Sequence, residues 1–401
     1  MVTDTGSDTN TKFAPIDWEE VGTSTILLSR RTVAFLITLG ILGALFCYDW
    51  FIVSGANPTL TVGRFSWDIT RLDWLFLLSL LALVFYGVVP LVRNPQQTRL
   101  YWQRLRTNKL AVVSLLYLAM FFVIGTVGPL VLGQPRPSII AEYQPPMFLT
   151  TDAGSVAINC IGEVTQAGTN NLCHGTLQYP LGTTGSGEDM VTIIVAGMRV
   201  ALQVALITST IIVPIATGVG TVAGYAGGLI DEVLMRYVDI QQTVPAFLVY
   251  IILGFVLGSS LFLIVLVFGL LSWGGVARLV RSETLQRREK GYIMAARNAG
   301  VSRVQILRRH LLPNVSSTVI TAITQLIPLL LLAEAALAFL NLGVVALPSW
   351  GQMIARGFRS DYFIEAWWVS TIPLLFLIVT IVAFSLLGDA LRDVLDPREM
   401  T

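Results

Sequence analysis

The chain has little charge, and lysine is its scarcest charged residue. Charged residues make up 13% of the 401, against roughly a quarter in soluble domains, and lysine occurs only as Lys12, Lys109 and Lys290. No Gly-Lys-Ser or Gly-Lys-Thr string is present, which excludes a phosphate-binding loop of the Walker type in this sequence. The formal net charge of +1 gives no general attraction to nucleic acid. We therefore expect neither ATP hydrolysis by this chain nor nucleic-acid binding.

Apolar residues are what the sequence has in excess. They make up 54% of the chain, and the mean hydropathy is +0.71, values that indicate an integral membrane protein. A helix needs about 20 apolar residues to cross the hydrocarbon layer, and several runs are long enough. We predict an all-α membrane bundle of about eight spans, over residues 32–53, 72–92, 110–132, 191–222, 238–257, 261–280, 314–340 and 367–387.

Positive charge gathers in two loops between predicted spans. One runs from Arg93 to Lys109 with no acid, and the other covers residues 278–314. Basic loops stay on the cytoplasmic side, so we predict a multi-pass protein of the cell membrane with both termini on the cytoplasmic side. The predicted regions are a polar tail (1–31, with a short ordered piece near Trp18), a two-helix hairpin (32–93), a basic loop and first core helix (94–133), an external loop (134–188) and a core (189–401).

Histidine and cysteine are also rare. His174 and His310 fall on opposite sides of the predicted membrane, so we nominate no catalytic residue, metal site or bound cofactor. Cys160 and Cys173 flank a polar stretch of the external loop, where an oxidising compartment favours a disulfide; two free thiols or a metal site with His174 are the alternatives. The loop is longer than most connections and is either a small subdomain or a flexible insert.

The basic block 278–314 has internal order. Ser282 is placed to cap a helix that runs through Tyr292 to Ala299, and Gly300 can end it with a positive φ angle. Ser302 is placed to cap a second short helix, which Pro313 stops. The pattern predicts two short helices with a glycine hinge and one face of small residues, which lets another surface approach the backbone closely.

The spacing of this block resembles the cytoplasmic EAA loop of ABC importer permeases, and its fuller string resembles the dipeptide/oligopeptide branch. The residues that carry the resemblance are Tyr292, Ala295, Ala296, Arg297, Gly300, Arg309, His310 and Pro313. Met294 stands where the name-giving Glu would be, and His310 where an Ile is usual. The resemblance implies a coupling helix that docks into a groove on a separate ATPase. Gly300→Trp is then expected to leave membrane insertion intact but to uncouple that ATPase.

The resemblance extends over most of the chain after Leu105. It implies the bundle of a type I ABC importer permease (MetI-like), here preceded by two extra N-terminal spans. It also implies a homologous second permease, two ABC ATPase subunits that carry ATP and Mg, and an extracellular solute-binding protein, which the external loop could touch. Peptides, nickel complexes or other small solutes would cross the cell membrane by alternating access.

Two residues are candidates for the translocation path. Pro245 interrupts the fifth predicted span, and proline in a membrane helix often marks a moving or pore-lining element. Glu334 lies near the outer end of the seventh span and is expected to face a cavity, a partner helix or the outer water. An ion-coupled secondary transporter is the alternative function, although such proteins usually place acids at mid-membrane.

Overall fold

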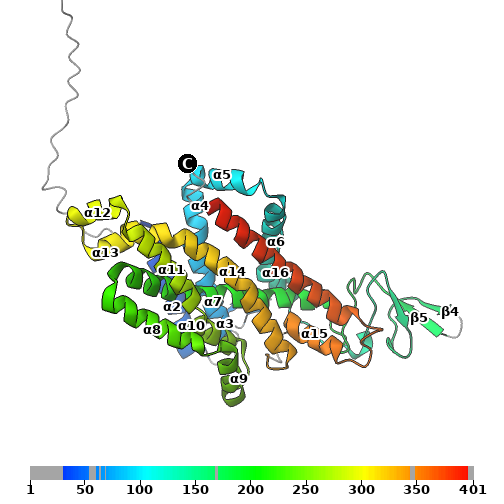
Figure 1. Cartoon of the computed structure of the whole chain (residues 1–401). Coiled ribbons are helices and arrows are strands. Elements are labelled where there is room, and N and C mark those ends of the chain that lie inside the picture. The colour runs from blue at the N-terminus through cyan, green and yellow to red at the C-terminus, as the bar shows by residue number, and fades with distance from the viewer. Residues whose placement is uncertain are drawn as a thin grey trace, which may run out of the picture. The chain divides into compact units, whose positions relative to one another are not determined.

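The computed structural model describes residues 30–53, 60–62, 65–67, 69–167, 170–343 and 348–395 (Figure 1). The ordered piece expected near Trp18 and the Asp396-Pro-Arg398 ending lie outside these ranges. Among the described residues, seven helices are long and apolar enough to cross a membrane, or eight if one bent pair counts as a single span. The predicted number of about eight agrees with this.

The chain divides into two compact units, of residues 1–55 and 56–401. In the first unit the structure describes α2 (Arg30–Phe51). Most of its apolar side chains are exposed, with Phe51 80% and Ile37 58% exposed. A helix of this length that is apolar all round suits a lipid environment.

The second unit contains all the other elements. It begins with a hairpin of β1 (Leu60–Val62) and β2 (Phe65–Trp67), then α3 (Arg71–Leu83), the π-helical turn η1 (Val84–Val88), α4 (Val89–Arg93), α5 (Pro95–Leu105) and α6 (Lys109–Leu132). After the external loop come α7 (Met190–Ala226), α8 (Gly228–Thr243), α9 (Ala246–Leu257), α10 (Leu261–Leu271), α11 (Gly274–Arg288), α12 (Gly291–Asn298), α13 (Arg303–Ile306), the π-helical turn η3 (Leu307–Leu311), α14 (Leu312–Phe339), α15 (Trp350–Phe358) and α16 (Trp368–Leu395).

Helix α7 is the centre of this unit. Its 37 residues make a helix about 56 Å long, and α3, α6, α10, α11 and α14 all pack against it (Figure 1). Most of its apolar side chains, such as Ile193, Ile207 and Ile212, are buried. The core therefore follows one continuous helix from the external loop to the 278–314 block.

A buried ion pair ties the extra helix α3 to α7. Arg199 Nη2 lies 2.6 Å from Asp73 Oδ1, and the Gln203 amide donates to the same oxygen at 3.2 Å. The other Asp73 oxygen accepts the Thr70 hydroxyl at 2.9 Å and the Thr70 N–H at 3.2 Å. The Asp73 N–H donates in return to Thr70 Oγ1, which completes a capping box. The Asp73 carboxylate thus caps the N-terminus of α3 and also binds α3 to α7. The sequence analysis did not predict the contact with α7.

Removing Asp73 is expected to destabilise the protein strongly. Asp73→Ala would leave Arg199 without its counter-charge at a site where the two side chains are only 9% and 16% exposed. Breaking such a pair from one side costs about 3 kcal/mol, which a lower thermal unfolding midpoint in detergent would reveal. The double variant Asp73→Leu/Arg199→Leu should recover most of the loss, and a double variant as unstable as the single one would contradict this account.

The external loop is a small folded subdomain rather than a flexible insert. It contains η2 (Ile139–Ala141) and an antiparallel sheet of β3 (Thr150–Asp152), β4 (Val164–Ala167) and β5 (Asn170–His174) in the order β3-β5-β4. Cys160 and Cys173 form a disulfide, so of the three alternatives the structure has this one. The sheet adds a β element to an otherwise helical fold.

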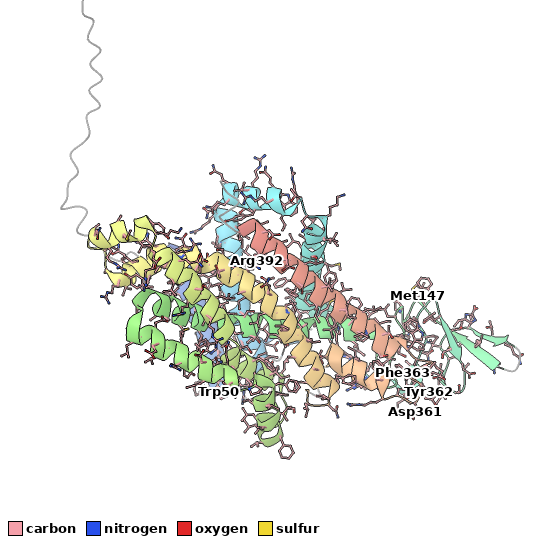
Figure 2. All side chains as sticks on the ribbon, viewed as in Figure 1. Trp50, Met147, Asp361, Tyr362, Phe363 and Arg392 are labelled. Atoms are coloured by element: carbon pink, nitrogen blue, oxygen red, sulfur yellow. A yellow bond between two sulfur atoms is a disulfide. The ribbon has the colours of Figure 1, made fainter. Side chains whose placement is uncertain are left out.

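The subdomain is attached to the start of α16. The Trp368 indole N–H donates to the Thr183 carbonyl oxygen at 3.0 Å, and the Tyr143 and Tyr362 rings meet edge to face at 5.3 Å. Figure 2 shows Tyr362 and Met147 at this junction. Trp368 is 1% exposed because the subdomain covers it.

Candidate functional site

The 278–314 block begins as a continuation of the sixth span. Helix α11 runs without a break from Gly274 to Arg288, so the prediction that Ser282 caps a new helix is wrong. Val280 and Thr284 on either side of Ser282 are fully buried. Packing of this face keeps the chain helical past a residue whose local preference is to start a helix.

Two glycines allow α11 to lie directly against α7. A Cβ atom at Gly220 would stand 2.6 Å from the Ala277 carbonyl oxygen, and one at Gly224 would stand 2.8 Å from the Arg281 carbonyl oxygen. Small residues spaced four apart allow such a close helix crossing. Gly228, four residues after Gly224, has a φ of +55° and no neighbour within 4 Å of its Cβ position, because the chain has already turned into α8.

Ion pairs fasten the same crossing from the α8 side. Arg281 donates from Nε and Nη2 to the two oxygens of Asp231, each at 2.5 Å, and Arg278 Nη2 donates to Asp239 at 2.7 Å. Arg288 donates to the Gly224 carbonyl oxygen at 3.2 Å. Helices α7, α8 and α11 are thus held together as one body at this end.

Helix α12 sits on a small apolar cluster at the end of that body. We define the loop cluster as Tyr225, Ile293, Ile306 and Leu311, all buried, with the half-buried Ala296 beside them. Tyr225 comes from the last turn of α7, so the cluster joins α7 to α12 and η3. Figure 1 shows α12 and α13 at the end of α11.

The predicted hinge is present, but the predicted helix stop is not. Gly300 has a φ of +77°, and Ser302 Oγ accepts the Gln305 N–H at 3.3 Å, so the left-handed glycine and the cap of α13 are confirmed. Pro313 lies in the first turn of α14 instead of ending a helix. Proline is tolerated there, and the preceding turn widens to a π-helix in which the Leu312 N–H bonds to the Leu307 carbonyl oxygen.

The outer side of α12 is exposed and mostly small. We define the α12 face as Tyr292, Ala295 and Ala299, which share one side of the helix and are all exposed. Of the residues predicted for coupling, Tyr292, Ala295, Arg297, Gly300, Arg309 and Pro313 are exposed, whereas Ala296 and His310 are half-buried. The rings of Tyr292 and His310 lie 6.3 Å apart. Six of the eight predicted residues are therefore exposed, and Ala296 is turned inward toward the loop cluster.

Arg297 braces the loop internally. Its guanidinium carbon lies 5.7 Å from the centre of the Tyr225 ring, within the range of a cation–π contact. A double-mutant cycle of Arg297→Gln and Tyr225→Leu is expected to give a coupling energy of about 0.5–1 kcal/mol in thermal unfolding. If the two substitutions change thermal unfolding additively, Arg297 does not interact with Tyr225 and acts only on a partner protein.

The two translocation-path candidates lie in different surroundings. Pro245 precedes α9 at a bend of 63° between α8 and α9. Glu334 is only 7% exposed, so it faces protein rather than the outer water. Tyr250 donates to the Leu342 carbonyl oxygen at 2.6 Å and ties α9 to the segment after α14. Asn341 there has a φ of +65°, a left-handed conformation that asparagine adopts more readily than most residues.

Two family models match this chain. Residues 216–400 match the family described as binding-protein-dependent transport system inner membrane component, and residues 96–146 match the N-terminal TM domain of oligopeptide transport permease C. The dipeptide transport system permease protein DppC of Bacillus subtilis is 32% identical over 300 residues, 74% of this chain and 84% of that one. The oligopeptide transport system permease protein OppC of Haemophilus influenzae is 32% identical over 306 residues, 75% of this chain and 90% of that one.

A solved structure is also similar to part of the chain. A chain of the inward-facing MetNI methionine ABC transporter aligns with 51% of this chain and 97% of its own length, at 19% identity and a TM-score of 0.42. The sequence matches overturn the ion-coupled alternative. This chain belongs to the family of binding-protein-dependent transport system inner membrane components, in the branch that contains the DppC and OppC permeases.

Proposed function

We propose that this permease subunit imports peptides or similar small solutes, driven by ATP hydrolysis on separate subunits that dock on the α12 face. The observation that carries the proposal is the exposed α12 face, which is mostly small and lies on the body formed by α7, α8 and α11. Ala295 and Ala299 are exposed, so a partner surface can approach the α12 backbone closely. Beneath them, Ile293 is fully buried in the loop cluster, so movement of α12 is transmitted to the rest of the chain.

The relatives support the proposed cargo and partners. Their names describe dipeptide and oligopeptide transport systems, and the matched family is named for dependence on a binding protein. We place in the assembly a homologous second permease, two ABC ATPase subunits with ATP and Mg, and an extracellular solute-binding protein. Both termini and α12 lie on the cytoplasmic side in this arrangement, because the segment from Arg93 to Lys109 and the 278–314 block are strongly basic.

The contacts among α7, α8, α11 and α12 suggest how closure of the ATPases moves the membrane-spanning helices. When the two ATPases close, the α12 helices of the two permeases move together. Movement of each α12 moves α11. Helix α11 in turn moves α7 and α8, because the close contacts at Gly220 and Gly224 and the Arg281–Asp231 ion pair hold the three helices as one body. The bend at Pro245 separates α9 from this body, so the outer ends of the spans can adopt a different angle and open toward the binding protein.

The proposal is tested by what accompanies the chain and what drives uptake. The chain is purified from its native membrane in mild detergent, its partners are identified, and the complex is reconstituted in vesicles. A sister permease, a Walker-motif ATPase and ATP-dependent peptide uptake are expected. Isolation without partners, together with uptake that needs no ATP, would contradict the proposal.

A further inference from the structure

Helix α5 lies across the ends of two membrane spans. Residues 71–93 form the span before it, and residues 109–132 form the span after it. Only Asn94 separates α4 from α5, and only residues 106–108 separate α5 from α6. Figure 1 shows α5 running across the ends of α4 and α6. Connections this short hold α5 at the membrane surface, in the layer of the lipid headgroups.

One side of α5 is fixed against the protein. Leu105 is buried together with Ala111 of α6 and with Ala390 and Val394 of α16, and Tyr101 packs on the same cluster. Residues four apart, such as Tyr101 and Leu105, lie on one side of a helix. The other sides of α5 therefore point away from the bundle.

Trp102 shares one of these outward sides with two arginines. Arg99 precedes Trp102 by three residues and Arg106 follows it by four, the spacings that bring helical side chains next to one another. All three residues are exposed, Trp102 at 45%, and we define them as the α5 face. Tryptophan is enriched at the membrane–water interface, and an arginine beside it can extend its guanidinium to the phosphate groups.

The surroundings of the α5 face are basic. Residues 93–109 contain no acid and five basic residues, which are Arg93, Arg99, Arg104, Arg106 and Lys109. Within the part of the chain that the structure describes, none of these five side chains takes part in an ion pair. The end of α16, which packs on α5, adds two acids and one arginine, so positive charge still predominates. An anion from outside the chain therefore meets a positive surface here.

We propose that the α5 face binds the headgroup of an anionic phospholipid such as phosphatidylglycerol. Arg99 and Arg106 donate hydrogen bonds to phosphate oxygens, and Trp102 lies between them at the boundary with the acyl chains. A cluster of about four or more basic residues directly cytoplasmic of a membrane span is typical of surfaces that bind anionic lipids. The inference goes beyond peptide import and does not depend on which solute is carried.

The first test asks whether the α5 face lies among the headgroups. In the full chain with Cys47→Ser in nanodiscs, a bimane label on Trp102→Cys is compared with one on Tyr292→Cys, whose parent residue is 44% exposed. Tyr292 follows a span of 28 residues, which at about 42 Å is longer than the hydrocarbon layer. Phosphatidylcholine with a TEMPO quencher on its headgroup should quench the label at position 102 strongly and leave position 292 near its full intensity.

The second test asks whether the headgroup must be anionic. Phosphatidylglycerol or phosphatidylcholine with the same acyl chains is added to the delipidated complete transporter in detergent. The lipid concentration that raises the thermal unfolding midpoint by half of its maximal shift is measured. Phosphatidylglycerol should act at a concentration at least about tenfold lower, because each basic residue near an anionic surface adds about a factor of five to binding. Salt at about 0.5 M should remove most of the difference.

Matched substitutions distinguish the α5 face from positive charge in general. Arg99→Gln with Arg106→Gln should raise the half-saturating concentration of phosphatidylglycerol about 30-fold. Arg99→Lys with Arg106→Lys keeps both charges and should raise it less than about fivefold. The control Lys290→Gln with Arg303→Gln removes two exposed cations of the 278–314 block and should change it less than about twofold.

Several results would overturn the proposal. Equal half-saturation by the two lipids would mean that the headgroup charge is not recognised, and equal weakening by the two glutamine pairs would mean that the α5 face is not the site. Displacement of phosphatidylglycerol by millimolar inorganic phosphate would identify a soluble anion as the ligand. Equal quenching at positions 102 and 292 would place the α5 face in water, where an acidic protein surface rather than a lipid would cover it.

Discussion

Ala295→Trp is expected to abolish ATP-driven uptake while the chain still inserts and folds. Ala295 is exposed in the middle of the α12 face, so an indole there would hold the docking partner away from the α12 backbone. A loss of about 3 kcal/mol at such an interface corresponds to about 100-fold weaker docking. The measurement is ATP-driven uptake and binding-protein-stimulated ATPase activity in vesicles, with thermal unfolding as the check on folding.

A matched control variant distinguishes loss of docking from a general effect of adding a large side chain. Gln103→Trp places the same side chain on an exposed position of α5, another helix in a basic loop, and should leave uptake unchanged. Normal ATP-driven uptake by Ala295→Trp would mean that the partner docks elsewhere on the chain.

Gly300→Trp is a less direct probe of the same surface. No atom lies within 4 Å of a Cβ atom at Gly300, but its φ is +77°, a conformation that costs most other residues about 1–2 kcal/mol. Tryptophan there would both block docking and strain the hinge. Gly300→Asn, which adopts this conformation readily, tests the hinge alone and should retain most of the uptake.

Gly224→Leu is expected to separate α7 from α11 and to lower stability sharply. A Cβ atom at Gly224 would stand 2.8 Å from the Arg281 carbonyl oxygen and 2.8 Å from Thr284 Cβ, so a leucine has no room unless one helix moves. Overpacking of this kind costs about 1–3 kcal/mol. The thermal unfolding midpoint should fall, and uptake should be lost because α11 no longer moves with α7.

A second glycine of α7 allows the same glycine-to-leucine change to serve as a control. Gly218 lies on the same helix with no atom within 4 Å of its Cβ position, so Gly218→Leu makes the same change without a clash. Its unfolding midpoint and uptake should equal those of the wild type. If Gly218→Leu were as damaging as Gly224→Leu, loss of helix flexibility rather than close packing would explain both.

Several features followed from the sequence because they depend on length or on near neighbours. Hydrocarbon thickness sets the length of a span, so long apolar runs located the membrane helices without knowledge of their contacts. The positive φ of Gly300 and the Ser302 cap depend on residues a few positions away. The basic block was recognisable from its spacing for the same reason.

Helix boundaries inside the block depended on packing instead. Ser282 has the local chemistry of a helix cap, but burial of Val280 and Thr284 against α7 keeps α11 continuous. Pro313 has the local chemistry of a helix stop, but it falls in a first turn where its missing N–H is not needed. At Ser282 tertiary packing overrode a weak local preference, whereas at Pro313 the position of the residue within its helix decided the outcome.

What the sequence by itself determined was the class of membrane protein, the approximate spans and the surface that carries the α12 motif. The tertiary structure alone decided that Asp73 neutralises Arg199, that Cys160 pairs with Cys173, and that Gln241 reaches the end of α10. The first group rests on hydrophobic length and short-range spacing, which are written along the chain. The second requires side chains from separate segments to meet, and only the folded packing determines which of them do.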